Sequence, residues 1–337
     1  MQAHIKKIFL NKKIAINSIV IFIVVFFVGY FVGNYREKMV INNFIKSFKN
    51  IRQGNEKYPL IDPLLGVTSA PATDVGVYVS MKDDIVSYLE SEKQEGELYD
   101  YSFYFKDLDS PLWFGINEEK SFTPASLFKI PIALVIYRQG EIDPAFLKKK
   151  VVYTNEMAQI NADQNNEVSA LTIGATYSIE DLVTIMLEFS DNGAKNLLAT
   201  NLDPRYIKDL FSVMLLVDPF SAQGYEISSR KYALFLRILY NASYLDEEHS
   251  NYLLSLLTKS TFKDGLVAGL PQGIEVAHKF GTYTETSVGV SVLHDCGIAY
   301  IPEDPFVVCI MTKGKNVTSL LRVISNVTKI VYEGERE

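Results

Sequence analysis

Residues 123–131 read Thr-Pro-Ala-Ser-Leu-Phe-Lys-Ile-Pro and place Ser126 three residues before Lys129. Side chains three residues apart share a helix face, one turn from each other, so the Lys129 amine can reach the Ser126 hydroxyl. A serine hydroxyl needs an adjacent base to act as a nucleophile at neutral pH. Lysine is such a base only where burial or a nearby cation lowers its pKa. This step is therefore a candidate nucleophile–base pair.

The same Ser-x-x-Lys spacing occurs twice more, at Ser228 and at Ser260, so spacing alone does not identify the nucleophile. Only Ser126 is followed, in order, by Ser190-Asp191-Asn192 and Lys279-Phe280-Gly281-Thr282. Each motif alone also fits a structural role, because serine, aspartate and asparagine are common helix caps and turn residues. We therefore interpret Ser126 as the head of the series. We expect Ser228, Ser260 and the second Lys-x-Gly at residues 263–265 to be solvated helix or loop residues.

The ordered triple resembles the motif set of penicillin-recognising serine hydrolases. Longer flanks match as well, and the resemblance to the class A β-lactamase-like family covers roughly residues 80–333. These flanks are residues 122–129, 177–198, 277–282 and 294–300. The resemblance implies an α+β fold of the β-lactamase/transpeptidase type, with a five-stranded antiparallel sheet flanked by helices and an all-helical subdomain.

The same resemblance implies roles for the motif residues. Ser126 would form the acyl-enzyme, and Lys129 would accept its proton, directly or through Ser190. The backbone N–H groups of Ser126 and Thr282 would form the oxyanion hole. Lys279, the first residue of the Lys-x-Gly motif that ends at Gly281, would attract a substrate carboxylate and help keep Lys129 neutral. Asn192 would bind the acylamide side of the substrate, whereas we expect Asp191 to shape its own turn.

Two departures from the family pattern bear on turnover. The Glu-x-x-Leu-Asn run that positions the deacylating water in class A β-lactamases has no counterpart between Ser190 and Lys279, which are 89 residues apart. Asp218 and Glu226 are the only nearby acids, and we assign neither as the base. Phe280 replaces the usual Thr or Ser of the Lys-x-Gly motif. Thr282 or Thr284 could supply the missing hydroxyl. The Phe280 side chain itself could equally be packed into the core.

The pattern of apolar residues predicts one sheet with helices packed on it. Helical periodicity covers residues 81–92, a strand pair follows at 101–105 and 113–116, and a helix starts at Ser126. Residues from about 140 to 270 are mostly helical, with predicted helices at 179–187, 192–199, 229–240 and 246–257. Three strands at 275–280, 287–301 and 306–312 and a helix at 317–331 then end the chain. This order indicates a sheet with a helical insertion beside it.

Charge is unevenly distributed along the 337 residues, whose formal net charge is −7. Residues 1–52 hold nine of the 33 Lys/Arg and one of the 40 Asp/Glu, which leaves 24 basic and 39 acidic residues for the rest. An acidic main domain argues against nucleic acid as a partner. No Cys/His cluster has metal-ligand spacing, so we expect no cofactor and no metal. Cys296 and Cys309 lie on consecutive predicted strands; we expect two buried free thiols, with a disulfide as the alternative.

The amino-terminal region predicts a membrane anchor. Residues 14–33 carry no charge and are long enough to span a bilayer, and no small-x-small cleavage site follows them. We predict a basic tail at 1–13, a transmembrane anchor at 14–33, a linker at 34–78 and a hydrolase domain at 79–335, with a cleaved signal peptide as the alternative to the anchor. Basic residues flank the segment on both sides, so charge does not decide orientation.

The sequence therefore predicts a single-pass membrane protein with an extracytoplasmic serine hydrolase domain that acts on β-lactams or related cell-wall amides. Two alternatives share this fold and nucleophile. One is a penicillin-binding D,D-peptidase that acts on peptidoglycan stem peptides. The other is a β-lactam sensor or binder that is acylated without turnover. Either would follow if the chain acylates Ser126 but lacks the group that removes the acyl chain.

Overall fold

The computed structural model describes residues 22–33, 35–36, 50–67, 78–165, 169–220, 225–285 and 287–336, with backbone alone at 163–165. The predicted basic tail, residues 14–21 of the predicted anchor, and residues 34, 37–49 and 68–77 of the predicted linker lie outside this set. Residues 22–33 are helical and exposed. Within the described part of the chain, no helix combines the length and apolarity needed to cross a bilayer.

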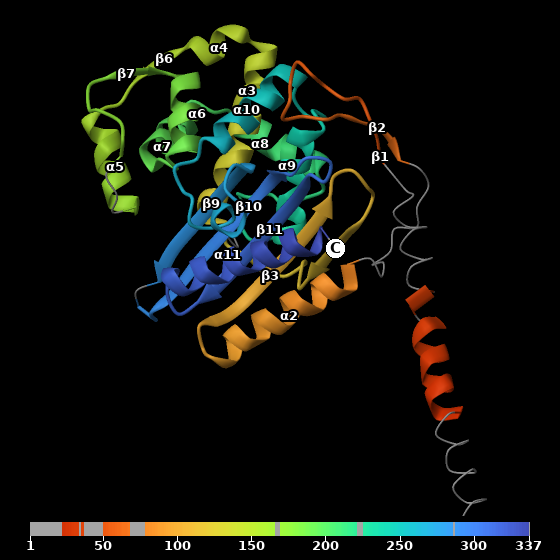
Figure 1. The fold of residues 1–337 in the computed structure, drawn as a ribbon. Coiled ribbons are helices and arrows are strands. Elements are labelled where there is room, and N and C mark those ends of the chain that lie inside the picture. Colours follow the sequence, from red (N-terminus) through yellow and green to blue (C-terminus); the bar gives the residue numbers. More distant parts are fainter. Residues whose placement is uncertain are drawn as a thin grey trace, which may run out of the picture.

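A five-stranded antiparallel sheet lies at the centre of the folded unit, in the order β4-β3-β11-β10-β9 (Figure 1). Its strands are β3 (Leu98–Asp107), β4 (Trp113–Ile116), β9 (Glu275–Glu285), β10 (Val290–Tyr300) and β11 (Phe306–Gly314). The middle strands β10 and β11 are buried almost throughout, because helices cover both faces of the sheet. This arrangement confirms the predicted fold class.

One face of the sheet packs against α2 (Val79–Gln94) and the carboxy-terminal helix α11 (Val317–Gly334), which lie together in the lower part of Figure 1. Helix α11 is amphipathic and buries Leu320, Ile324, Val327 and Val331 at helical spacing. Their partners are the alternate residues of β3, Phe103 among them. This layer forms one hydrophobic core.

The opposite face carries the helical part of the molecule and a second, larger core. The helices of this part are α3 (Lys129–Ile142), α4 (Pro144–Lys148), α5 (Asn155–Asn165), α6 (Ile179–Glu188), α7 (Asn192–Ala199), α8 (Pro204–Val213), α9 (Ser229–Tyr240) and α10 (Glu247–Thr258). Short strand pairs connect them: β5 (Ser121–Phe122) with β8 (Ile227–Ser228), and β6 (Lys150–Val152) with β7 (Thr176–Ser178). The helices begin at local sequence signals. At α6, for example, Ser178 and Asp181 form a capping box.

Part of the predicted linker belongs to the folded unit. Residues 50–67 contain a hairpin of β1 (Asn50–Arg52) and β2 (Leu64–Val67). The Asn50 side chain donates to the carbonyls of Leu108 and Ser110, 2.8 and 2.9 Å away. Leu60 and Ile61 are buried in the larger core. Residues 50–67 of the predicted linker are therefore a packed hairpin.

The expected pair of free thiols is wrong, because Cys296 and Cys309 form a disulfide. The two residues face each other directly in the register of β10 and β11, and both are fully buried. The sequence spacing allowed this pairing but did not establish the register.

The expected solvation of Ser228 and Ser260 is also wrong, because both side chains are buried. Ser228 caps α9 by accepting a hydrogen bond from the backbone N–H of Lys231. Polar side chains at helix ends are often buried in this way when they satisfy backbone groups. The sequence alone does not distinguish a serine that caps a helix from a buried position from a serine in solvent.

Candidate active site

Ser126 lies on a 3-10 turn, η2 (Ala125–Phe128), and not at the start of the predicted α-helix. Helix α3 begins only at Lys129, so Pro131 falls in its first turn, where a missing N–H is tolerated. Ala125 has a φ of +49°, in the left-handed region that costs a non-glycine residue energy. The backbone is thus bent sharply immediately before the nucleophile candidate, whose side chain is half-buried.

The edge strand β9 holds this turn from the other side. A Cβ atom at Gly281 would lie 2.7 Å from the Pro124 carbonyl oxygen and 3.1 Å from the Ser126 backbone nitrogen. Only glycine allows such a close approach of two backbones. Strand β9 is therefore packed at Gly281 directly against the backbone of the nucleophile turn.

Lys129 is buried one turn after Ser126, with 1% of its surface exposed. Its Nζ lies 3.0 Å from Ser126 Oγ and 3.2 Å from Ser190 Oγ, and it also donates to the Ser190 carbonyl. Oγ atoms of two serines from separate motifs thus meet at one amine. In its neutral form this amine has a lone pair within reach of either hydroxyl proton.

The second motif lies between α6 and α7. Ser190 has a φ of +57°, which turns its hydroxyl toward the two lysines. Asp191 is buried; its carboxylate caps α7 through the Ala194 N–H at 2.7 Å and accepts from Ser169 Oγ at 2.8 Å. As predicted, Asp191 shapes its own turn. Asn192 follows as the first, half-buried residue of α7.

Lys279 is fully buried on β9, and its Nζ lies 2.8 Å from Ser190 Oγ and 2.9 Å from the Phe280 carbonyl oxygen. Burial lowers the pKa of Lys279 well below its ordinary value, and the nearby charge of Lys129 lowers it further, against the opposing effect of Asp295. Two ammonium groups on one buried hydroxyl repel each other, which favours a pair with only one positive charge. The site therefore provides both a cation and an amine able to accept a proton.

Phe280 occupies the position where the family pattern has a hydroxyl, and it packs against the core. Its ring stacks on Phe262 with centroids 4.0 Å apart and an interplanar angle of 19°. Thr282 Oγ1 donates to the Val292 carbonyl at 2.9 Å, and Thr284 Oγ1 lies 3.1 Å from Ser291 Oγ. Both candidate replacements for the missing hydroxyl are thus bonded to β10.

Asp218 and Glu226, the two acids near the expected position of a deacylating base, make other contacts or lie in solvent. Asp218 lies 3.6 Å from the Lys208 ammonium and accepts from the backbone N–H of Phe220. Glu226 is exposed at the start of β8. Among the described hydrogen bonds, neither carboxylate contacts Ser126.

His294 supports the nucleophile turn and was not identified from the sequence. Its Nε2 lies 3.1 Å from the Thr123 carbonyl oxygen, and its Nδ1 accepts from the Thr312 N–H at 3.1 Å, so the ring is neutral and donates through Nε2. Burial lowers the pKa of His294 from 6.5 to about 4. His294 lies opposite Gly281 in the strand register. The only signal in the sequence was an unexplained histidine on an apolar strand.

A further buried pair lies beside the site. His278 Nδ1 is 2.8 Å from Asp295 Oδ1, and neither side chain is exposed. Asp295 also accepts from the Leu266 N–H at 2.9 Å. Elsewhere, Glu141, Asp246 and His249 form the one group in the described residues with several metal-ligating atoms close together, and they already contact one another.

The sequence matches the model of a family described as the Beta-lactamase enzyme family over residues 82–334. Solved structures with a similar fold include PBP-A, which is 19% identical with a TM-score of 0.64, covering 77% of this chain and 96% of that one. A class A β-lactamase from Mycobacterium abscessus is 21% identical with a TM-score of 0.64, covering 76% of this chain and all 100% of its own.

A mutant of PBP-A, described as an acyl-enzyme complex with penicillin G, is 20% identical with a TM-score of 0.63. The similarity covers 76% of this chain and 97% of that one. A comparison with curated protein sequences gives no match. At these identities the structural likeness establishes the fold.

Proposed function

The chain belongs to the Beta-lactamase enzyme family, and we propose that it is a serine hydrolase that forms an acyl-enzyme at Ser126 with β-lactams or related cell-wall amides. One observation carries the proposal. A continuous series of contacts runs from Ser126 Oγ through Lys129 Nζ and Ser190 Oγ to Lys279 Nζ, with distances of 3.0, 3.2 and 2.8 Å.

This series provides a route for the proton in acyl transfer. Ser126 Oγ attacks the substrate carbonyl carbon while its proton passes to the Lys129 amine, directly or through Ser190. The oxyanion accepts hydrogen bonds from the backbone N–H groups of Ser126 and Thr282. When the intermediate collapses, the carbonyl C–N bond breaks and the proton returns through Ser190 to the leaving nitrogen. The single positive charge of the Lys129–Lys279 pair lies on Lys279 when Lys129 acts as the base, and it then supplies positive potential for a substrate carboxylate.

The substrate class follows from the family and from the cation. β-Lactams and peptidoglycan stem peptides both present a carbonyl near a carboxylate, which a positive charge on Lys279 would attract. The acyl-enzyme with penicillin G described for a PBP-A mutant supports a penicillin as the first compound to test. Asn192, at the start of α7, would bind the acylamide group of either substrate.

A second candidate function is that of a penicillin-binding D,D-peptidase or a binder that is acylated without turnover. The observation that favours it is the placement of Asp218 beside Lys208 and of Glu226 in solvent. Among the described hydrogen bonds, neither carboxylate contacts Ser126 or the lysines beside it. In this case a penicillin would acylate Ser126 and stay bound.

We also propose that residues 14–33 anchor the chain in the cytoplasmic membrane with the hydrolase domain outside it. The support is the uncharged sequence of these residues and the location of peptidoglycan outside that membrane. Membrane fractionation followed by protease treatment of intact cells tests this. Digestion of the domain is expected, and full protection would refute the proposed orientation.

The catalytic proposal is tested by incubating the protein with penicillin G and following adduct mass and hydrolysed product together. Ser126→Ala is expected to abolish both. Ser260→Ala is the matched control, because Ser260 has the same Ser-x-x-Lys spacing and a buried Oγ that has no hydrogen-bond partner among the described residues. Steady product indicates a β-lactamase, whereas a long-lived adduct indicates the second candidate. An adduct that persists in Ser126→Ala would refute the nucleophile.

A further inference from the structure

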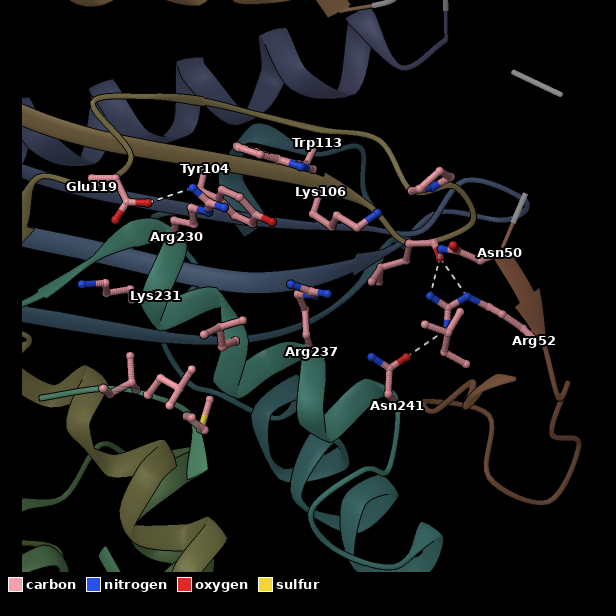
Figure 2. A pocket seen from close by; sticks show the side chains of 17 residues that line it. Asn50, Arg52, Tyr104, Lys106, Trp113, Glu119, Arg230, Lys231, Arg237 and Asn241 are labelled. Carbon is pink, nitrogen blue, oxygen red and sulfur yellow. Dashed lines mark hydrogen bonds and ion pairs between the residues drawn. The ribbon is translucent and has the colours of Figure 1, made fainter. Parts of the chain in front are cut away.

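A basic cavity of about 500 Å³ lies at the edge of the sheet opposite to Ser126 (Figure 2). The active site adjoins β9, whereas this cavity is bounded by β3 and β4, by one face of α9, by β1 and by residues 214–216. Its wall contains one carboxylate, that of Glu119, and five basic side chains: Arg52, Lys106, Arg230, Lys231 and Arg237. This excess of positive charge contrasts with the acidic composition of the domain.

Three of these cations are held by the protein itself. Arg230 Nη1 lies 2.9 Å from Glu119 Oε1, and its guanidinium lies 4.5 Å from the centre of the Trp113 ring. Arg52 donates from Nε to the Leu108 carbonyl at 2.8 Å. Lys106 donates to three backbone carbonyls around residues 107–112. These side chains form a rigid basic wall.

The other two cations, Lys231 and Arg237, form no ion pair with any carboxylate that the structure describes. Both line the cavity from α9; Arg237 lies near the middle of the drawn lining, between Lys106 and Asn241, and the Lys231 side chain extends away from Arg237 at the left of the view (Figure 2). Arg237 is only partly exposed and adjoins the Tyr104 hydroxyl. A guanidinium has five donors in a fixed fork that matches a carboxylate or a phosphate.

The charged groups of the wall act on Lys106. The pKa of Lys106 is lowered to about 7, chiefly by burial; the charge of Asp107 raises it, and the charges of Arg237 and Arg52 lower it. The two arginines therefore repel a positive charge on Lys106. A bound anion would relieve this repulsion.

Part of the remaining wall is apolar. Met214, Leu215, Leu216 and Leu234 line it, and Leu215 is 91% exposed in a left-handed backbone conformation with φ of +55°. An exposed leucine beside a basic cavity suits a ligand that has an apolar part as well as a charge.

We propose that this cavity binds a small organic anion whose carboxylate or phosphate groups are held by Arg237 and Lys231 and whose apolar part rests on residues 214–216. The site is separate from the acylation site, so it does not depend on the proposed function. It makes the protein responsive to a second, anionic small molecule.

Isothermal titration of the full-length protein with pyrophosphate and, separately, with citrate tests the proposal. Saturable binding of at least one anion is expected. Arg237→Gln should weaken it by about 10-fold or more, as expected for a charge-assisted hydrogen bond, and Lys231→Gln by about 3-fold. The control Arg205→Gln removes an equally charged side chain that is outside the cavity and paired with Asp203, and should bind normally.

Lys279→Ala separates this site from the acylation site and should also bind normally. Binding of pyrophosphate alone assigns the ligand as a phosphate compound, binding of citrate alone as a carboxylate, and both results support the site. Lys231→Gln keeps the test informative if Arg237→Gln fails to fold, because Lys231 is exposed. The proposal is refuted if neither anion binds saturably, if the Arg205 control weakens binding as much as the cavity variants, or if Lys279→Ala abolishes it.

Discussion

His294 should make the folded domain lose stability between pH 7 and pH 5. The folded pKa is about 4 and the unfolded value is 6.5, so the unfolded chain binds more protons between these two values. Stability therefore falls as the pH is lowered through this window and levels off below it. At pH 5 the unfolded ring is almost fully protonated and the folded ring is almost neutral. The resulting loss relative to pH 7 is about 2 kcal/mol.

The structure gives this loss a physical origin. Protonation would place a charge in a fully buried site, and Nδ1 could no longer accept the hydrogen bond of the Thr312 N–H. The bond from Nε2 to the Thr123 carbonyl, three residues before Ser126, favours the charged form but offsets the burial only in part. We expect the nucleophile turn to loosen only near pH 4, where the folded ring itself becomes protonated.

Urea unfolding at pH 5, 6 and 7 measures the effect, with the fluorescence of the single tryptophan, Trp113 on β4, as the probe. Other groups also titrate, so the comparison is with His294→Gln, whose amide can still donate a hydrogen bond but does not titrate. The wild type should lose about 2 kcal/mol more than the variant between pH 7 and pH 5. Equal losses in the two proteins would refute the proposed neutral, buried His294.

Three further predictions concern the supports of the site. Gly281→Ala would push a methyl group against the Pro124 carbonyl, so the rate of acylation by penicillin G should fall about 10-fold and stability by about 1–3 kcal/mol; an unchanged rate would contradict the close approach. Replacing Cys296 and Cys309 by alanine removes a cross-link that spans 13 residues and should cost about 3 kcal/mol in urea unfolding, and a midpoint equal to that of the oxidised wild type would contradict it. Asp191→Ala leaves the Ala194 N–H without its cap and should cost about 1–2 kcal/mol; circular dichroism melts that match the wild type would exclude this capping role.

Local sequence signals predicted most elements of this fold. Helices α7 and α9 begin and end where their caps and apolar periodicity placed them, because capping and amphipathicity act over a few residues. The three late strands were likewise recognisable from their apolar runs. Differences occurred where a distant segment changes the local structure. Strand β9 packs against η2, for example, and Ser126 lies on a 3-10 turn and not in an α-helix.

The sequence by itself determined the fold class and the order of the three motifs, because the five strands, the helical insertion and the Ser-x-x-Lys step have short-range signatures. Only the tertiary structure decided that Ser126, Ser190 and Lys279 meet at one place. Ser190 and Lys279 are 89 residues apart and join through a 2.8 Å contact. That contact depends on the register of β9 and on the left-handed turn at Ser190, which arise from packing across the whole domain.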